Sequence, residues 1–326
     1  MIYLEFLEGQ GLGNQLWNYV TLRSLSKVLG FEYKVLHPER FKGKNFLDIS
    51  YSNTKTFKLY KDEFFISNVF NEKLYYDNHL NAFISDFDNQ VLSIETNTII
   101  RGLFQSERYL FNNDINEFIK VKSIHKEKIR ARKNKCLLNI RGREYKRFKK
   151  LILPKSYWLN AMRNMKSYNN NLTFAIITDD YDYASKLLPE IEIIKGDSQE
   201  DFFNILFADY LIVSNSSFSY FPINLGEKPK KIIAPAHWAR FGNSEEIWIS
   251  PSNYYKNWSY QNKEGKIISK IIAEESIKKT MSIYSKYYIL TSKESLKRKT
   301  IFSFFPKSLR KNLKKFLSRF LPLHIG

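Results

Sequence analysis

Polar side chains follow three predicted strands of the chain at the point where each strand ends. The clusters are Arg141 with Arg143 and Glu144 after residues 136–140, Asp179 with Asp180 after residues 172–177, and Ser216, Ser217 and Ser219 after residues 210–213. Because ligands of parallel sheets bind beyond the carboxyl ends of the strands, we expect the clusters to line one binding site. Taken singly, the Asp pair also fits a helix N-cap, the Ser cluster a turn, and the Arg-rich loop a solvated surface.

These residue types match what a nucleoside diphosphate needs. An arginine fork binds phosphate oxygens in a bidentate manner, and serine hydroxyls with backbone N–H groups at a helix start complete an anion site. Glycosyl transfer from a nucleotide sugar fits, because its leaving group is a nucleoside diphosphate whose developing charge an arginine stabilises. We identify no Asp-x-Asp triplet at a predicted strand end that would bind a metal, so we expect metal-independent chemistry and no cofactor.

A glycine-rich segment near the N-terminus, residues 9–15, is a second candidate site. It follows the apolar run 1–7 and precedes an apolar-periodic stretch, 19–29, which predicts a strand, a turn and a helix. Gly11 and Gly13 let the backbone approach a ligand, and Asn14 adds a side-chain amide at the helix mouth. A βα turn without a ligand remains the alternative, because one glycine-rich turn is a weak signal.

The elements that would position these residues alternate between strands and helices. Predicted strands cover residues 1–7, 31–36, 136–140, 172–177, 191–194, 210–213 and 231–234, and residues 99–109 are predicted to be a strand that runs into a loop. Predicted helices cover 19–29, 120–135, 181–188 and 201–208, and Pro154 opens a further helix that carries Tyr157, Trp158, Ala161 and Met162 on one face. This alternation predicts an α/β fold with parallel, doubly wound sheets. The chain of 326 residues suits two domains, and residues 37–100 show only weak periodicity.

The amino-acid composition limits which classes of protein and which cellular compartment are compatible with this chain. A single cysteine, Cys136, excludes an internal disulfide and a cysteine-based zinc cluster, and fits a reducing cytosol. We find no signal-peptide pattern and no apolar run long enough to cross a membrane. The net charge of +19 fits nucleic acid, an anionic membrane or a phosphorylated substrate as partner.

The C-terminal residues carry much of that charge. Residues 293–319 contain ten Lys and Arg and one Glu, and leucines and phenylalanines lie on one helical stripe between residues 309 and 321. This pattern is typical of a helix that lies in the plane of a membrane surface. The alternatives are a helix packed on the protein's own core and, less favoured, an RNA-binding tail.

Several segments resemble the α-1,2-fucosyltransferase family, glycosyltransferase family 11, in the correct order over residues 1–240. Gly9-Gln10-Gly11-Leu12-Gly13-Asn14-Gln15 is similar to the family's opening Gly-Gly-Leu-Gly-Asn-Gln, and residues 102–109 are similar to its Gly-Tyr-Phe-Gln-Ser-Glu-Lys-Tyr segment. Residues 139–145 are similar to its His-Val-Arg-Arg-Gly-Asp-Tyr motif, and residues 174–180 and 201–219 to its later motifs. Asn139, Gly142 and Glu144 depart from the pattern where the family has His, Arg and Asp.

The resemblance implies a GT-B-like fold, with two Rossmann-like domains, and an inverting, metal-independent transferase that uses GDP-fucose. The residues it implies for the donor are Gly11, Gly13, Asn14, Arg141 (on the β-phosphate), Asp179, Asp180, Asp201 (on guanine), Ser216 and Ser217. Arg141 and Glu144 are the catalytic candidates, with Glu107 and Glu8 as further candidates for a general base. Arg143 is a candidate to compensate for the arginine that Gly142 replaces.

These lines combine into one set of expectations. We expect an acceptor-side domain at residues 1–130, a donor-binding domain at 131–250, a helical segment at 251–295 and a basic, membrane-associating tail at 296–326. The expected activity is transfer of fucose to a glycan or lipid-linked oligosaccharide, with an α-1,2 linkage, in cell-surface polysaccharide synthesis on the cytoplasmic face of the membrane. The alternatives are another nucleotide-sugar donor, or a non-catalytic, basic nucleotide-binding protein on the membrane; nucleic acid is not an expected partner.

Overall fold

The computed structural model describes the residues from Met1 to Glu275, with gaps. The described ranges are 1–53, 66–72, 74–77, 82–85, 87–122, 134–147, 151–236 and 254–275. The chain divides into two compact units, Met1–Glu275 and Ser276–Gly326, of which the second lies outside these ranges. The predicted tail, residues 296–326, and the predicted domain boundaries near 130 and 250 therefore also lie outside the described residues.

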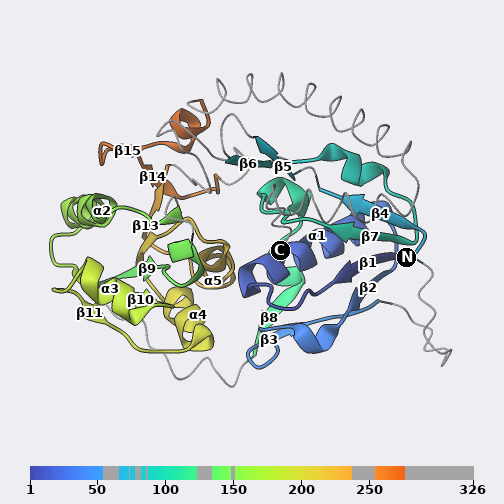
Figure 1. Ribbon diagram of the computed structural model, residues 1–326, viewed down its shortest axis with the longest axis horizontal. Coiled ribbons are helices and arrows are strands. Elements are labelled where there is room, and N and C mark those ends of the chain that lie inside the picture. The colour runs from blue at the N-terminus through green and yellow to red at the C-terminus, as the bar shows by residue number, and fades with distance from the viewer. Residues whose placement is uncertain are drawn as a thin grey trace, which may run out of the picture. The chain divides into compact units, whose positions relative to one another are not determined.

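Two parallel sheets organise the first unit (Figure 1). The first sheet has the strand order β2-β1-β7-β4, with strands β1 (Ile2–Glu5), β2 (Tyr33–Leu36), β4 (Asn68–Asn71) and β7 (Thr98–Arg101). All its pairings are parallel, so the carboxyl ends of its strands share one edge. Two antiparallel pairs accompany it, β3 (Leu47–Ile49) with β8 (Ile119–Val121), and β5 (Leu74–Asp77) with β6 (Ala82–Ser85).

The second sheet has the strand order β11-β10-β9-β12-β13-β14-β15. Its strands are β9 (Lys135–Ile140), β10 (Thr173–Thr178), β11 (Glu192–Ile193), β12 (Tyr210–Val213), β13 (Lys231–Pro235), β14 (Ser259–Gln261) and β15 (Ile267–Ile268). Every pairing is parallel except that of β14 with β15. The predicted α/β class with parallel sheets is therefore confirmed.

The helices connect these strands. The α-helices are α1 (Leu12–Leu29), α2 (Lys155–Tyr168), α3 (Tyr181–Leu187), α4 (Ser198–Leu206) and α5 (Tyr220–Leu225). The 3₁₀ helices are η1 (Pro38–Arg40), η2 (Asn89–Ser93), η3 (Glu107–Leu110), η4 (Ile115–Glu117), η6 (Glu144–Arg147) and η8 (Ser217–Ser219). Helix α1 begins seven residues before the predicted residue 19 and ends as predicted, where Gly30 takes a left-handed conformation with φ of 68°.

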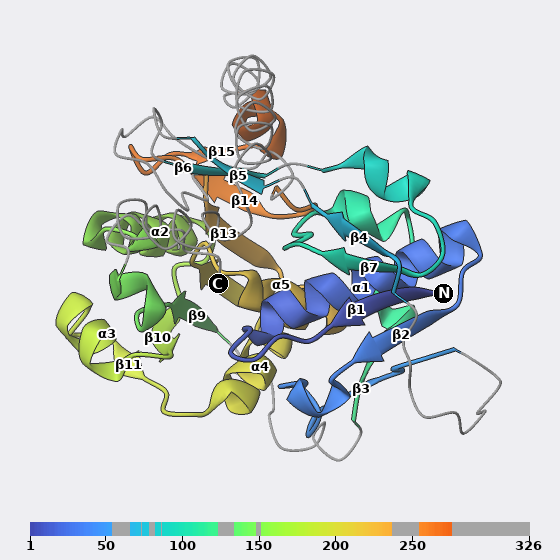
Figure 2. The same ribbon diagram turned by 45° about the vertical axis from the view of Figure 1, so that its right-hand side comes forward.

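Helix α1 is buried on most of its surface, because it packs on β1 and β2 of the first sheet and also on η8 and α5, which follow β12 of the second sheet (Figure 2). Its residue Trp17 is fully buried and lies 4.3 Å, between ring centroids, from Tyr220 of α5 and 5.2 Å from Phe221. The rings of Phe46 and Phe202 form a second such contact, 5.1 Å apart. Aromatic packing thus joins helix α1 to α5, and the residue before β3 to α4.

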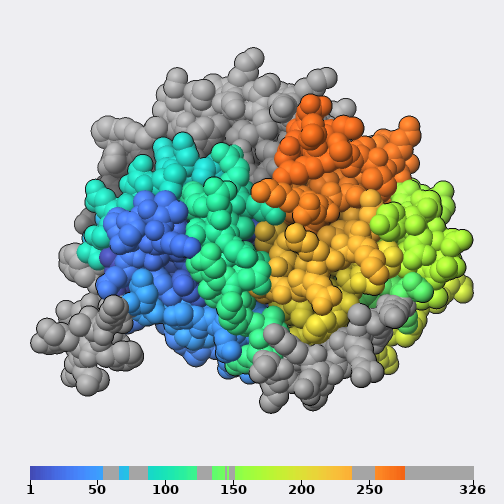
Figure 3. Space-filling model, turned by 180° about the vertical axis from the view of Figure 1, so that it is seen from behind, coloured from blue at the N-terminus to red at the C-terminus, as the bar shows by residue number. Residues whose placement is uncertain are grey.

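The segment 254–275 differs from the helical segment predicted for residues 251–295. Its described part adds β14 and β15 to the second sheet before a helical turn begins at residue 270. Figure 3 shows this segment, in orange, packed beside the gold residues that include β13. Likewise, the predicted helix 120–135 starts within β8 and ends at the first residue of β9, so its two ends are strands. Pairing with β3 and β10 gives these two ends the strand conformation, and the periodicity of a lysine-rich segment does not reveal such distant partners.

Candidate functional site

Arg141 stands at the point where the second sheet changes its winding direction. From β9 the chain proceeds to β10 and β11 on one side, whereas β12, β13 and β14 lie on the other side. We call the boundary between β9 and β12 the second switch point. Arg141 follows β9 directly, and Ser214 follows β12. Ligands of open α/β sheets bind at such boundaries, so the position itself favours a binding role for Arg141.

The guanidinium of Arg141 pairs with one carboxylate and keeps one buried N–H without a hydrogen-bond partner among the described residues. Its Nη2 lies 3.1 Å from a carboxylate oxygen of Asp179, whose other oxygen accepts a hydrogen bond from the Gly142 N–H at 2.8 Å. The Cζ atom lies 5.6 Å from the ring centroid of Phe218, and the buried Nε has no hydrogen-bond partner among the described residues. Asp179 thus orients an arginine that retains a donor for a ligand.

Asp201 of α4 is the third charged group of this site. The side chain is almost fully buried, and its Oδ1 lacks a hydrogen-bond partner among the residues that the structure describes. Burial raises the pKa of Asp201 to about 7; the positive charge of Arg141 opposes this shift, and the negative charge of Asp179 adds to it. The helix that carries Asp201 is fixed by a capping box, in which Asp197 accepts from two backbone N–H groups and Glu200 accepts from the Asp197 N–H.

Asp180 has a local structural role. It caps helix α3 by accepting a hydrogen bond from the Tyr183 N–H at 3.1 Å, and it pairs with Lys146. Burial alone would raise the pKa of Asp180, but Lys146 and the Tyr183 N–H lower it below the usual value. Asp180 also explains the glycine that departs from the family motif, because a Cβ at Gly142 would lie 2.5 Å from the Asp180 Cβ. Either Asp180 or the backbone would have to move to admit an arginine there.

The serine loop contacts the first half of the unit through Asn14. The Oδ1 of Asn14 accepts hydrogen bonds from Ser217 Oγ at 2.8 Å and from Gln105 Nε2 at 2.7 Å. Ser216 instead caps η8, since its hydroxyl accepts from the Phe218 N–H at 3.3 Å. The structure therefore brings Asn14, from the glycine-rich segment, to the loop that follows β12.

The three glycines of the glycine-rich segment, residues 9–15, differ in whether the structure requires a glycine at that position, and why. Gly9 has a φ of 76°, which favours glycine, whereas Gly11 has an ordinary backbone conformation, and a Cβ added there would have no atom within 4 Å. At Gly13, a Cβ would lie 2.6 Å from the carbonyl carbon and oxygen of Ser217. Gly13 thus permits close contact between the start of α1 and the serine loop, which is a packing role not anticipated from the sequence.

The candidate bases differ in how their carboxylates are engaged. Glu107 accepts from the Tyr220 hydroxyl at 3.2 Å and from the Lys256 N–H at 3.2 Å, so both of its oxygens join parts of the fold. Glu8 lies exposed in the turn after β1. Glu144 belongs to η6, and only its backbone is described. Arg143 is exposed beside η6. The structure therefore favours a structural role for Glu107 and leaves the catalytic assignment of Glu144 a prediction.

Two buried polar residues, Asn139 and Gln15, hold the site in roles that were not predicted from the sequence. Asn139, inside β9, accepts a hydrogen bond from Ser219 Oγ at 3.0 Å, and its Nδ2 has no partner in the described part of the chain. Gln15 is fully buried and joins α1 to residues 40 and 42 through two hydrogen bonds of 2.9 Å. A polar residue within an otherwise apolar strand or helix face was the available signal.

No group of three or more His, Cys, Asp or Glu side chains within the described ranges is arranged to hold a metal ion. The expectation that no Asp-x-Asp triplet follows a strand is wrong, because residues 86–88 follow β6 and residues 180–182 follow β10. In the second triplet Asp180 caps α3 and Asp182 is exposed. Metal-independent chemistry remains a prediction. No helix in the described part of the chain is both long enough and apolar enough to span a membrane.

Comparison with known proteins finds one local relative among curated sequences. The chain is 32% identical over 96 residues to an α-1,2-colitosyltransferase of Escherichia coli, a match that covers 27% of this chain and 33% of the relative. The chain thus aligns with about a third of the length of the curated relative it matches. No family model matches the sequence.

Among solved structures, the similar chains include fucosyltransferase NodZ from Bradyrhizobium. One such crystal structure has a TM-score of 0.39 and 13% identity and covers 70% of this chain and 96% of that chain. A structure of NodZ α-1,6-fucosyltransferase soaked with GDP-fucose has a TM-score of 0.37 and 14% identity, and covers 69% and 92%. The local sequence match makes this chain similar to a glycosyltransferase; the roles of its residues must come from its own geometry.

Proposed function

We propose that this protein is a glycosyltransferase that moves fucose from GDP-fucose to a hydroxyl group of a glycan acceptor. The observation that carries the proposal is the convergence of Arg141, Asp179 and Asp201 at the second switch point, where Arg141 keeps an unpaired Nε. An oriented arginine suits a diphosphate, and a buried carboxylate suits the N–H groups of guanine. The sequence similarity to a colitosyltransferase supports the same class of reaction.

In the proposed reaction the acceptor oxygen bonds to the anomeric carbon while the bond from that carbon to the diphosphate oxygen breaks. GDP leaves with the electron pair, and the acceptor proton passes to a base or to solvent. Arg141 offsets the charge that develops on the leaving diphosphate, and Asp179 fixes its orientation. Attack from the opposite face inverts the anomeric centre. The GT-B resemblance, inversion and independence from metal are parts of the proposal.

Asp201 gives the donor site a pH dependence. A carboxylate that accepts hydrogen bonds from guanine must be ionised, and its pKa of about 7 leaves much of it protonated below neutral pH. Binding of GDP then requires release of a proton from Asp201 at acidic pH. We infer that donor affinity rises as the pH rises through about 7.

The relative named above supports a second candidate donor. Its activity concerns colitose, which is the 3-deoxy analogue of fucose, so a GDP-colitose donor would present the same nucleotide and differ only in the sugar. The α-1,2 linkage in the name of that relative agrees with the linkage expected from the sequence motifs. Transfer rates with GDP-fucose and GDP-colitose, measured on one acceptor, decide between the two sugars.

We further propose that residues 296–326 bind the anionic cytoplasmic face of the membrane, where lipid-linked oligosaccharide acceptors would be available. The support is the basic and leucine-rich sequence alone. Flotation with anionic vesicles, compared between the full chain and a chain ending at residue 295, tests this part. Equal flotation of the two chains would contradict it.

A thermal-shift panel with GDP, UDP, CDP and a short RNA tests the proposed donor class. We expect stabilisation by GDP only. Stabilisation by UDP or CDP but not GDP would favour another nucleotide sugar, and stabilisation by RNA alone would favour a non-catalytic, nucleic-acid-binding protein. A subsequent assay of fucose transfer from GDP-fucose separates a GDP-binding protein from a transferase.

A further inference from the structure

The first sheet has a switch point of its own, with charged residues at its edge. Strand β1 leads through α1 to β2 on one side, and its other neighbour, β7, comes later in the chain. We call the boundary between β1 and β7 the first switch point. Glu5 is the last residue of β1 and Arg101 the last residue of β7. The topology therefore places an acidic and a basic side chain where an α/β sheet binds its ligands.

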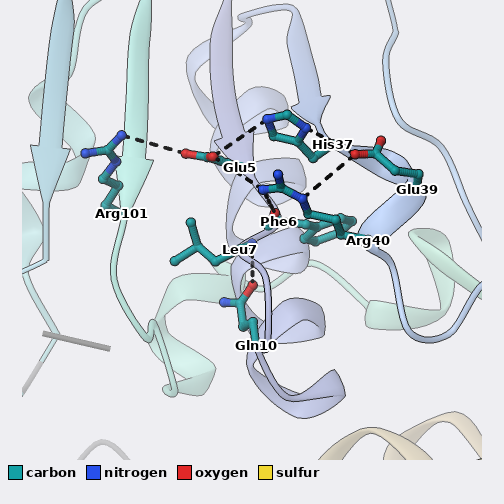
Figure 4. Close-up of polar contacts among 8 residues, drawn as sticks. All are labelled: Glu5, Phe6, Leu7, Gln10, His37, Glu39, Arg40 and Arg101. Atoms are coloured by element: carbon teal, nitrogen blue, oxygen red, sulfur yellow. Dashed lines mark hydrogen bonds and ion pairs between the residues drawn. The ribbon is translucent and has the colours of Figure 1, made fainter.

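Glu5 is surrounded by three basic side chains (Figure 4). Its carboxylate oxygens lie 3.7 Å from Arg40 Nη1, 3.7 Å from Arg101 Nη2 and 3.8 Å from His37 Nε2. These separations are those of ion pairs and exceed those of hydrogen bonds. Within the described ranges no residue donates a hydrogen bond to the Glu5 carboxylate, whose side chain is 24% exposed. The two arginines hold the charge in place, and the carboxylate keeps hydrogen-bond acceptor capacity for another donor.

The basic partners are themselves positioned by the backbone. Arg40 donates from Nη1 to the carbonyl oxygen of Phe6 at 3.3 Å, as Figure 4 shows. Its own carbonyl accepts a hydrogen bond from the side chain of Gln15 at 2.9 Å. Gln15 follows Asn14 on α1, and Asn14 contacts the serine loop after β12. One helix start therefore connects the surroundings of Glu5 with the loop at the second switch point.

Glu107 offers a useful contrast with Glu5. Both oxygens of Glu107 already accept hydrogen bonds from elements of the fold, whereas the contacts of Glu5 are ionic only. Ion pairs of this length between half-exposed side chains stabilise a fold by about 0–1 kcal/mol each. A purely structural cluster therefore gives little reason for an acidic residue at the end of a central strand.

We propose that the first switch point binds the acceptor glycan, whose hydroxyl groups donate hydrogen bonds to Glu5. The N–H groups of Arg101 donate to sugar oxygens beside it, because the Arg101 side chain is 56% exposed and in reach of Glu5. The preferred ligand is a neutral, hydroxyl-rich sugar. This inference rests on the proposed transferase function and names the substrate side of it.

The test compares Glu5→Gln with Glu39→Gln. Glu39 also pairs with His37 and Arg40 but is 65% exposed and does not contact Arg101, so it is a matched control. Transfer from labelled GDP-fucose onto a printed glycan array first identifies an acceptor of the wild-type protein. We expect Glu5→Gln to raise the KM for that acceptor about tenfold, because charge-assisted hydrogen bonds are lost, with GDP affinity and melting temperature unchanged. Glu39→Gln should retain the wild-type KM.

Arg101→Ala is the second variant, because removal of an exposed side chain leaves folding intact. We expect it to raise the acceptor KM while GDP-fucose hydrolysis in water stays at the wild-type rate. An acceptor KM within about twofold of wild type in both Glu5→Gln and Arg101→Ala contradicts the acceptor site and leaves the transferase function standing. Failure of the wild type to bind GDP or to label any glycan contradicts the proposed function, and this inference with it.

Discussion

The two switch points of the molecule use charge in opposite ways. At the second, an arginine is oriented by one carboxylate, lies near another and keeps an unpaired donor, which suits an anion. At the first, a carboxylate is held by surrounding basic side chains and keeps free acceptor capacity, which suits hydroxyl donors. The topology of the two boundaries is alike, so the difference arises from the residues that end the strands. In the proposed function, these strand-end residues assign the two boundaries to different substrates.

The connection between the two sites is direct. Asn14 and Gln15 are neighbours at the start of α1; the first contacts the serine loop after β12 and the second holds the backbone at Arg40. Gly13 permits this arrangement, because any larger residue would meet the backbone of Ser217. We expect variants at these three places to change different quantities. Variants at the second switch point should change turnover and GDP binding, variants at the connection should change stability, and variants at the first switch point should change the acceptor KM.

The largest effect is expected for Arg141→Ala. Loss of the guanidinium removes the charge that offsets the leaving diphosphate, so kcat for fucose transfer should fall by about a hundredfold or more. Arg141→Lys should recover only part of this loss, because lysine lacks the bidentate fork. Steady-state kinetics with GDP-fucose provide the measurement, and the exposed Arg143→Ala is the control. Near wild-type turnover in Arg141→Ala would remove Arg141 from the proposed site.

Gly13→Ala should disrupt the connection. The new methyl group would lie 2.6 Å from the Ser217 carbonyl group, and relief of such overpacking costs about 1–3 kcal/mol of the free energy of unfolding. Chemical denaturation provides the measurement. Gly11→Ala is the control, because its Cβ meets no atom within 4 Å; it should cost only the about 1 kcal/mol or less by which Ala is a poorer N-cap than Gly. Equal stability of the two variants would show that the start of α1 does not pack on the serine loop.

The pH dependence of GDP binding sharpens the assignment of Asp201. Its pKa of about 7 exceeds the ordinary value of 3.8, so its contribution to stability is full below 3.8 and is lost as the pH rises through 7. If GDP binds the ionised form, affinity should fall about tenfold per pH unit below 7. Calorimetry from about pH 5.5 to about pH 8.5 measures both effects. Asp201→Asn should flatten the profile and the exposed Asp182→Asn should not; a flat wild-type profile contradicts this role.

The smallest effect is expected at Asn14. Asn14→Ala removes the oxygen that accepts from Ser217 and Gln105, which should lower the free energy of unfolding by about 1 kcal/mol. Asn14→Asp keeps this oxygen and adds a negative charge, so stability should be retained while GDP affinity falls. Thermal melts with and without GDP measure both quantities. Weaker GDP binding in Asn14→Ala but not in Asn14→Asp would assign the connection, and not the charge, as the cause.

Much of the second sheet was predictable because its strands are short, apolar and bounded by turn residues. The predicted strand at 210–213 agrees with β12, and the predicted strand at 136–140 differs from β9 by one residue. The segments containing β4, in the first sheet, and β14, in the second, were not predicted, because their strands mix polar with apolar side chains. Their pairing with β7 and β13 selects the strand conformation, and pairing partners distant in the sequence leave no local pattern.

The residues of the candidate site also divide into those that the sequence indicated and those that only the structure could assign. Strand-end position indicated Arg141, Asp179 and Ser217, and the structure places these three at or beside the second switch point. The same rule was available for Glu5 and Arg101 but was not applied, because single charged residues after short apolar runs are common in sequences. Asp180 and Ser216 also end strands, yet their side chains cap helices. The sequence alone does not distinguish a capping side chain from one that faces a ligand.

The sequence by itself determined the α/β class, the positions of the main βα units and the kinds of residue at the strand ends, because periodicity, glycine and capping residues act locally. Only the tertiary structure decided which strand ends meet, since strand order depends on pairing between segments far apart in the chain. Burial, which raises the pKa of Asp201, and the close approach of Gly13 to Ser217 likewise arise only when distant segments pack. The residues proposed for the chemistry were visible in the sequence; their grouping at two switch points came from the fold.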